Sequence, residues 1–171
     1  MQVLRRVLCL IAIAGFATGL AVYFESFNGL TLDKMFGWLF AIHLGVFLVI
    51  APIFVVERSA IRQKTFFWND FLIGKPYWVF PVIKLLGAIF IIHFVLFLVL
   101  SHAASPAIVN GNYVLNDHGH IRKFLTESEY RTLKGHELRI FPTGWMDFYA
   151  VAAIYWWFPK SSERDTQEAV A

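Results

Sequence analysis

Cysteine and charge are both scarce in this sequence of 171 residues. The single cysteine, Cys9, excludes an internal disulfide and therefore a disulfide-stapled scaffold. Only 16% of the residues are charged, against about 25% in a typical soluble domain, whereas 58% are hydrophobic and 18% are aromatic. A soluble domain of this size could not hide so much apolar surface from water. The composition therefore excludes the soluble globular, disordered and collagen-like classes of protein.

The common catalytic motifs are missing as well. The chain has no P-loop, no Gly-x-Gly-x-x-Gly, no Gly-x-Ser-x-Gly and no His-Glu-x-x-His sequence. Its formal net charge of +3 comes from scattered basic residues, whereas nucleic-acid binding needs a clustered basic face. We therefore expect a non-enzymatic protein that does not bind nucleic acid.

Long apolar runs make up a large part of the sequence. Because about 20 helical residues cross the roughly 30 Å of bilayer hydrocarbon, runs at 7–24, 35–56 and 78–100 are long enough to span a membrane. A fourth run, 144–158, is shorter and contains Asp147, so it spans only if its ends reach the interfaces or the bilayer thins locally. The predicted fold is an all-α integral membrane protein with four transmembrane helices in an antiparallel bundle.

The first run has a second interpretation. Arg5 and Arg6 precede it, as basic residues precede the apolar core of a signal peptide. However, the run is longer than a usual signal-peptide core, and it carries Gly15-x-x-x-Gly19, a spacing of small residues that lets two helices approach closely in lipid. We expect it to remain in the protein as a membrane helix.

Basic residues predict the orientation of the spans. Eight lysines and arginines lie in the two terminal segments and in the connection between the second and third runs, against Lys34 alone in the short opposite loop. The positive-inside rule then places both termini in the cytoplasm, and we assign the chain to a bacterial inner membrane. The connection 101–143 also carries basic residues, but none in its first twenty positions. Residues 161–171 are predicted to form a disordered cytoplasmic tail.

The connection 101–143 is predicted to fold as a small extracytoplasmic cap between the third and fourth spans. Two turn signals, each containing Asn and Gly, are each followed by a short extended run, a pattern that predicts a β-hairpin; the turns are 110–112 and 116–119 and the runs are 113–115 and 120–125. Thr126 and Glu129 then have the spacing of a capping box. A short helix is therefore expected from Glu127, and Pro142 is expected to end it before the fourth run.

An ordered loop of this length does more than connect two helices. The predicted function is therefore that of a non-enzymatic accessory or interaction protein in the lipid bilayer. Its extracytoplasmic cap would bind a membrane protein or an extracytoplasmic protein.

His43 and His93 are the most distinctive polar residues of the apolar runs. Counted at ~1.5 Å per residue, both lie about 10 to 12 Å below the outer interface, on consecutive antiparallel helices. Two neutral imidazoles across a gap could ligate the iron of haem b or line a quinone site. They could equally satisfy one another, or a backbone carbonyl, as structural residues. The alternative function is thus a haem-binding or quinone-associated electron-transfer subunit.

His118 and His120 are a candidate metal site in the predicted cap. On an extended strand they would project to the same side, as zinc or copper ligands do. The position of His118 in a turn weakens this geometry, because the strand need not begin before His120. Two more histidines, His102 and His136, lie in the same connection, and four histidines are also ordinary on a soluble surface.

Overall fold

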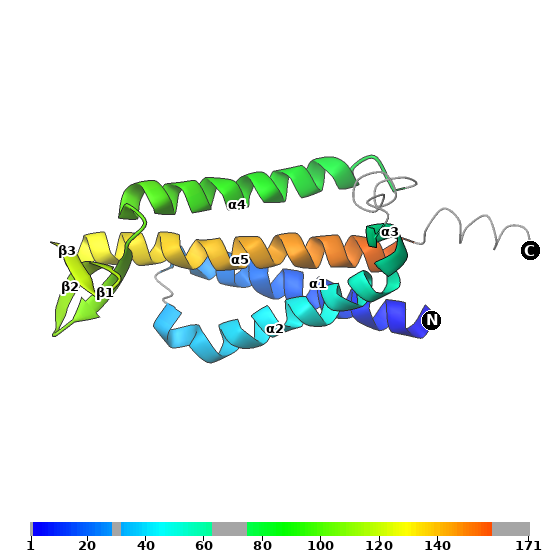
Figure 1. The fold of residues 1–171 in the computed structure, drawn as a ribbon, viewed down its shortest axis with the longest axis horizontal. Coiled ribbons are helices and arrows are strands. Elements are labelled where there is room, and N and C mark those ends of the chain that lie inside the picture. Colours follow the sequence, from blue (N-terminus) through cyan, green and yellow to red (C-terminus); the bar gives the residue numbers. More distant parts are fainter. Residues whose placement is uncertain (1, 29–31, 63–74, 159–171) are drawn as a thin grey trace, which may run out of the picture.

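The computed structural model describes residues 2–28, 32–62 and 75–158 (Figure 1). The predicted tail, 161–171, lies outside the described residues. Most of the described chain is helical, which confirms the helical part of the predicted fold. The helices are α1 (Gln2–Glu25), α2 (Leu32–Val56), the short α3 (Arg58–Arg62), α4 (Val79–Ser101) and α5 (Glu127–Trp157). Three segments are long and apolar enough to cross a membrane: α1, the Gly37–Val56 part of α2, and α4.

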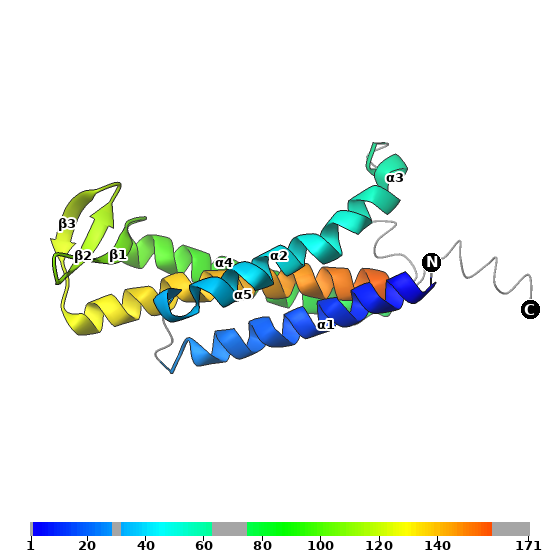
Figure 2. The same ribbon diagram turned by 90° about the horizontal axis from the view of Figure 1, so that it is seen from below.

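α5 is the central helix of the bundle. Figures 1 and 2 show α4 on one side of α5 and both α1 and α2 on the other, with successive long helices running in opposite directions. Figure 2 also shows that α2 crosses α5 at an angle. The buried core of the bundle lies among α1, α2 and α5, and it includes Leu8, Val49, Leu138 and Ala152.

Small residues allow α1 and α2 to approach α5. A β-carbon added at Gly15 would lie 2.3 Å from Cε1 of Tyr149, and one added at Gly19 would lie 3.1 Å from Cγ of Met146. On the other side of the same tyrosine ring, its hydroxyl donates a hydrogen bond of 2.6 Å to the carbonyl of Ile42 in α2. Both glycines of the small-residue motif in the first run therefore face α5.

The first half of α5 differs from the sequence-based prediction. The expected break at Pro142 is wrong, because α5 runs without interruption from Glu127 to Trp157 with Pro142 inside it. The predicted cap helix and the predicted fourth run are thus two halves of one helix. The bundle and the sheet are joined by a rigid element rather than by a turn.

Local hydrogen bonding and packing explain why the helix continues through Pro142. Proline lacks an N–H group and so removes one helical hydrogen bond. The hydroxyl of Thr143 donates to the carbonyl of Arg139 at 2.7 Å and lies 3.0 Å from that of Ile140, so one side-chain donor lies beside the interruption. Pro142 and Thr143 are both fully buried. Packing on both sides of α5 therefore holds the helix together where its local sequence is weakest.

A three-stranded antiparallel sheet lies at one end of the bundle, here called the sheet end (Figure 1). Its strands are β1 (Ser105–Val109), β2 (Asn112–Asp117) and β3 (His120–Phe124), in the order β1-β2-β3. Both turns contain residues with left-handed backbone conformations: Asn110 and Gly111 in the first, His118 and Gly119 in the second. Such conformations are what two-residue hairpin turns require. The sequence pattern predicts two of these strands, and β1 is a third that it does not predict.

Candidate functional site

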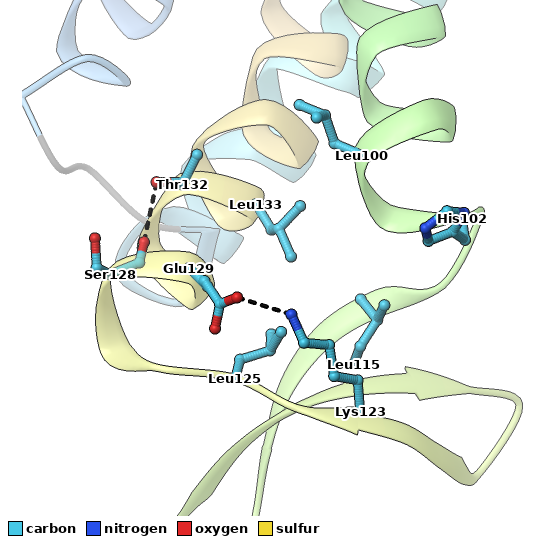
Figure 3. Close-up of a pocket in the computed structure, with 9 residues that line it drawn as sticks. All are labelled: Leu100, His102, Leu115, Lys123, Leu125, Ser128, Glu129, Thr132 and Leu133. Atoms are coloured by element: carbon cyan, nitrogen blue, oxygen red, sulfur yellow. Dashed lines mark hydrogen bonds and ion pairs between the residues drawn. The ribbon is translucent and has the colours of Figure 1, made fainter.

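A pocket of about 300 Å³ lies where the sheet meets α4 and α5 (Figure 3). Four leucines from different elements form its apolar wall, and polar side chains surround them. The leucines are Leu100, Leu115, Leu125 and Leu133, and the polar residues are His102, Lys123, Ser128, Glu129 and Thr132. Apolar walls with a few placed polar groups are the usual make-up of a small binding site. We take this junction pocket as the candidate functional site.

The backbone at the ends of α4 and α5 positions the pocket. His102 ends α4 in a left-handed conformation, with φ of 50°, and its N–H donates to the carbonyl of Leu98. The chain then turns into β1. On the other side, Thr126 caps α5: its hydroxyl accepts a 3.2 Å bond from the N–H of Glu129, and the Glu129 carboxylate accepts a 2.8 Å bond from the N–H of Thr126. The capping box predicted from the sequence is therefore present.

An ion pair links the sheet to the first turn of α5 beside the pocket. Nζ of Lys123 lies 2.7 Å from Oε1 of Glu129 (Figure 3). The hydrogen bond from Lys123, followed by those from Thr126, lowers the pKa of Glu129 to about 2. The carboxylate thus has a structural role at the α5 cap and an electrostatic role at the pocket.

We expect the Glu129 carboxyl to titrate near pH 2 in the folded protein rather than at its ordinary value of 4.5. Because its pKa is lowered on folding, its stabilising contribution is complete above pH 4.5 and is lost as the pH falls through about 2. Carboxyl ¹³C NMR of the solubilised protein measures this directly. Glu129→Gln should remove that part of the acid dependence, and a midpoint near 4.5 for Glu129 would contradict the capping geometry.

The structure does not bring His43 and His93 together. His43 is on α2 and His93 is on α4, and these helices pack on different sides of α5 (Figure 1). Nδ1 of His43 accepts a 3.2 Å hydrogen bond from the indole N–H of Trp145. A neutral imidazole has one acceptor nitrogen, so Nε2 of His43 then carries the proton. In this arrangement His43 has no lone pair left for an iron atom.

His118 and His120 have separate surroundings in the sheet. His118 is in the β2–β3 turn, where its Nδ1 lies 2.7 Å from Oδ1 of Asp117. That hydrogen bond is the main reason why the pKa of Asp117 is lowered, with Arg122 contributing further. His120 is an exposed residue at the start of β3. Across residues 2–28, 32–62 and 75–158, no three His, Cys, Asp or Glu side chains are grouped closely enough to hold a metal ion.

A polar cluster that the sequence pattern does not predict lies among α1, α4 and α5. Its members are Tyr23, Ser26, His93, His136 and Arg139. The Tyr23 hydroxyl lies 3.0 Å from Nε2 of His93. Nε of Arg139 donates to the Ser26 hydroxyl at 3.3 Å, and its guanidinium carbon lies 4.0 Å from the centre of the Phe27 ring.

Two imidazole nitrogens in this cluster are buried without a hydrogen-bond partner among the described residues: Nδ1 of His93 and Nδ1 of His136. No described carboxylate pairs with Arg139 either. The sequence signal was the spacing of His136 and Arg139, which are three residues apart and therefore on the same face of a helix. That signal is meaningful only when α5 is known to continue past Pro142 and to run beside α4.

No family model, curated protein or solved structure matches the chain.

Proposed function

We propose that the chain is an integral membrane protein whose extracytoplasmic cap binds another protein, without catalysing a reaction. The cap comprises the three-stranded sheet and the first two turns of α5, and its binding site would be the junction pocket. The proposed location is a bacterial inner membrane, with both termini in the cytoplasm. The observation that carries the proposal is the position of the junction pocket. It has an apolar wall surrounded by polar side chains, it lies at the end of the bundle, and its walls come from the sheet and from two long helices.

The packing of α4 and α5 supports a fourth membrane crossing. The rings of Trp78 and Phe158 lie 6.2 Å apart at one end of this helix pair. Near its middle, a β-carbon at Gly144 would lie 3.4 Å from the ring of Phe90. α4 has 23 residues, so about 23 residues of the chain before Phe158 run beside it. The fourth crossing would therefore begin near residue 135. This crossing is longer than the apolar run 144–158, and the remaining first turns of α5 reach the sheet.

Two polar groups near the start of this longer crossing have partners within the protein. Arg139 contacts Ser26 and Phe27 of the α1 end, and Lys134 pairs with Glu137 at 2.8 Å with both side chains largely buried. Polar side chains in a membrane segment are tolerated when they face the bundle and find partners there. The crossing therefore does not require these groups to face lipid.

The proposed orientation predicts a specific labelling pattern. Ile121→Cys in β3 should react with a membrane-impermeant maleimide added to intact spheroplasts, and Arg62→Cys in α3 should react only after the membrane is opened. Wild-type protein is the control, because its only cysteine is buried. The reverse pattern, or equal labelling of both sites, would contradict the orientation.

Crosslinking tests the binding role of the cap. A photo-crosslinking residue at Phe124, which is 65% exposed on β3, should capture one discrete membrane or extracytoplasmic protein in native membranes. Leu125→Asp in the same protein should abolish the capture, because a carboxylate would enter the apolar wall of the junction pocket. The matched control is the same crosslinker at Phe148, an exposed residue of the bundle. Capture of the chain alone from position 124 would overturn the proposal.

The redox alternative predicted from the sequence is disfavoured by the separate hydrogen bonds of His43 and His93. It has a direct test of its own. A reduced-minus-oxidised spectrum of the purified protein with a sharp α band, lost in His43→Ala, would replace the binding proposal by a haem b subunit.

A further inference from the structure

Two adjoining apolar pockets lie at the end of the bundle opposite the sheet, between α1 and the last turns of α5. Their volumes are about 280 and 460 Å³, and both are lined by Cys9 and Trp157. Ile13, Trp78 and Ala153 also line the smaller pocket, and Arg6 lines the larger one. We call the two together the terminal groove. It is an elongated apolar site with a cation at one edge.

Basic side chains gather around the open edge of the terminal groove. Arg6 is exposed, and no described carboxylate pairs with it. Arg5 and Lys75 donate to the same carbonyl, that of Phe158, at 3.1 and 3.0 Å. These bonds place two further cations at Phe158, the C-cap residue of α5. A negatively charged group at the groove edge would therefore pair with Arg6, and Arg5 and Lys75 would add positive charge at the same end of the bundle.

We propose that the terminal groove binds one anionic phospholipid, with an acyl chain along Cys9, Ile13 and Ala153 and the headgroup phosphate at Arg6. The apolar lining accepts hydrocarbon, and the arginine fork matches phosphate oxygens. Tryptophans at the same end, among them Trp157 with 66% of its surface exposed, are typical of the interface between lipid and water. Basic pockets between membrane helices on the cytoplasmic side bind anionic headgroups in this way. The inference rests on the proposed membrane placement.

Native mass spectrometry of the delipidated protein, offered equal amounts of phosphatidylglycerol and phosphatidylcholine, tests the lipid site. Wild-type protein should retain one phosphatidylglycerol in preference to phosphatidylcholine. Arg6→Gln should reduce this preference about fivefold, the ratio that corresponds to about 1 kcal/mol for one basic residue near an anionic lipid. The matched control is Arg62→Gln, which removes an exposed arginine of α3 at the same end and should leave the preference unchanged.

A second variant tests the apolar part of the groove. Ile13→Phe should lower the retention of both lipids, because the larger ring fills the space that the acyl chain would occupy. Equal retention of the two lipids by wild type, or an equal loss in Arg6→Gln and Arg62→Gln, would overturn the lipid site. Neither outcome would contradict the proposed membrane placement. Failure of wild type to insert into nanodiscs of either lipid would instead overturn the proposed function itself.

Discussion

Gly15→Ala is expected to lower the free energy of unfolding by about 2 to 4 kcal/mol, the sum of overpacking and of one strained hydrogen bond. The new methyl group would lie 2.3 to 2.6 Å from three atoms of the Tyr149 ring, well inside contact distance. The ring cannot move away freely, because its hydroxyl is bonded to the Ile42 carbonyl at 2.6 Å and lies against Gly45 of α2. One methyl group therefore disturbs the packing of α1, α2 and α5 together.

Gly87→Ala is the matched control for this substitution. A β-carbon at Gly87 would have no neighbour within 4 Å, so the change should be neutral or stabilising, since alanine favours a helix over glycine by up to about 1 kcal/mol. Reversible unfolding in mixed micelles, followed by circular dichroism, measures both variants. In a Tyr149→Ala background, Gly15→Ala should lower the free energy of unfolding only slightly. If Gly15→Ala were just as destabilising in that background, the clash with the Tyr149 ring would not be the cause of the destabilisation.

Helices were easier to predict from this sequence than the contacts between them. Each apolar run is a local property of the chain, since its length must match the bilayer. The haem hypothesis required in addition that consecutive helices be neighbours in space, with His43 facing His93. The structure places α5, the last helix in the sequence, between α2 and α4. Counting the depth of a residue along its own helix carries no information on which helix lies opposite.

The sheet and α5 also show that local signals are easier to predict from the sequence than the effects of packing. Both hairpin turns were recognised, because residues such as Asn110 and Gly111 adopt left-handed conformations for reasons within the turn itself. β1 was missed because Pro106 breaks the pattern of a strand, although proline is acceptable at the edge of a sheet. Pro142 predicts a helix end for the same local reason. There the packing of a buried helix outweighs the local preference.

Leu138→Ala is the second large effect that we expect, and it tests the continuity of α5. Leu138 is completely buried in the main core of the bundle, although the sequence analysis assigned it to an extracytoplasmic cap. Truncating a fully buried leucine leaves a cavity and typically costs about 2 to 5 kcal/mol. If α5 is continuous, this loss should appear as a shift of the global unfolding transition, measured by circular dichroism in mixed micelles.

Phe148→Ala removes a larger side chain ten residues along the same helix and serves as the control. Phe148 is 52% exposed, so its truncation should cost well under half as much as that of Leu138. The alternative architecture, a separate cap helix ending before Pro142, makes the opposite prediction for Leu138. Its truncation would then loosen only the cap, with increased hydrogen exchange there and an unchanged global transition. Because the two architectures differ in whether Leu138 unfolds with the bundle, the comparison decides whether the cap and bundle are one cooperative unit.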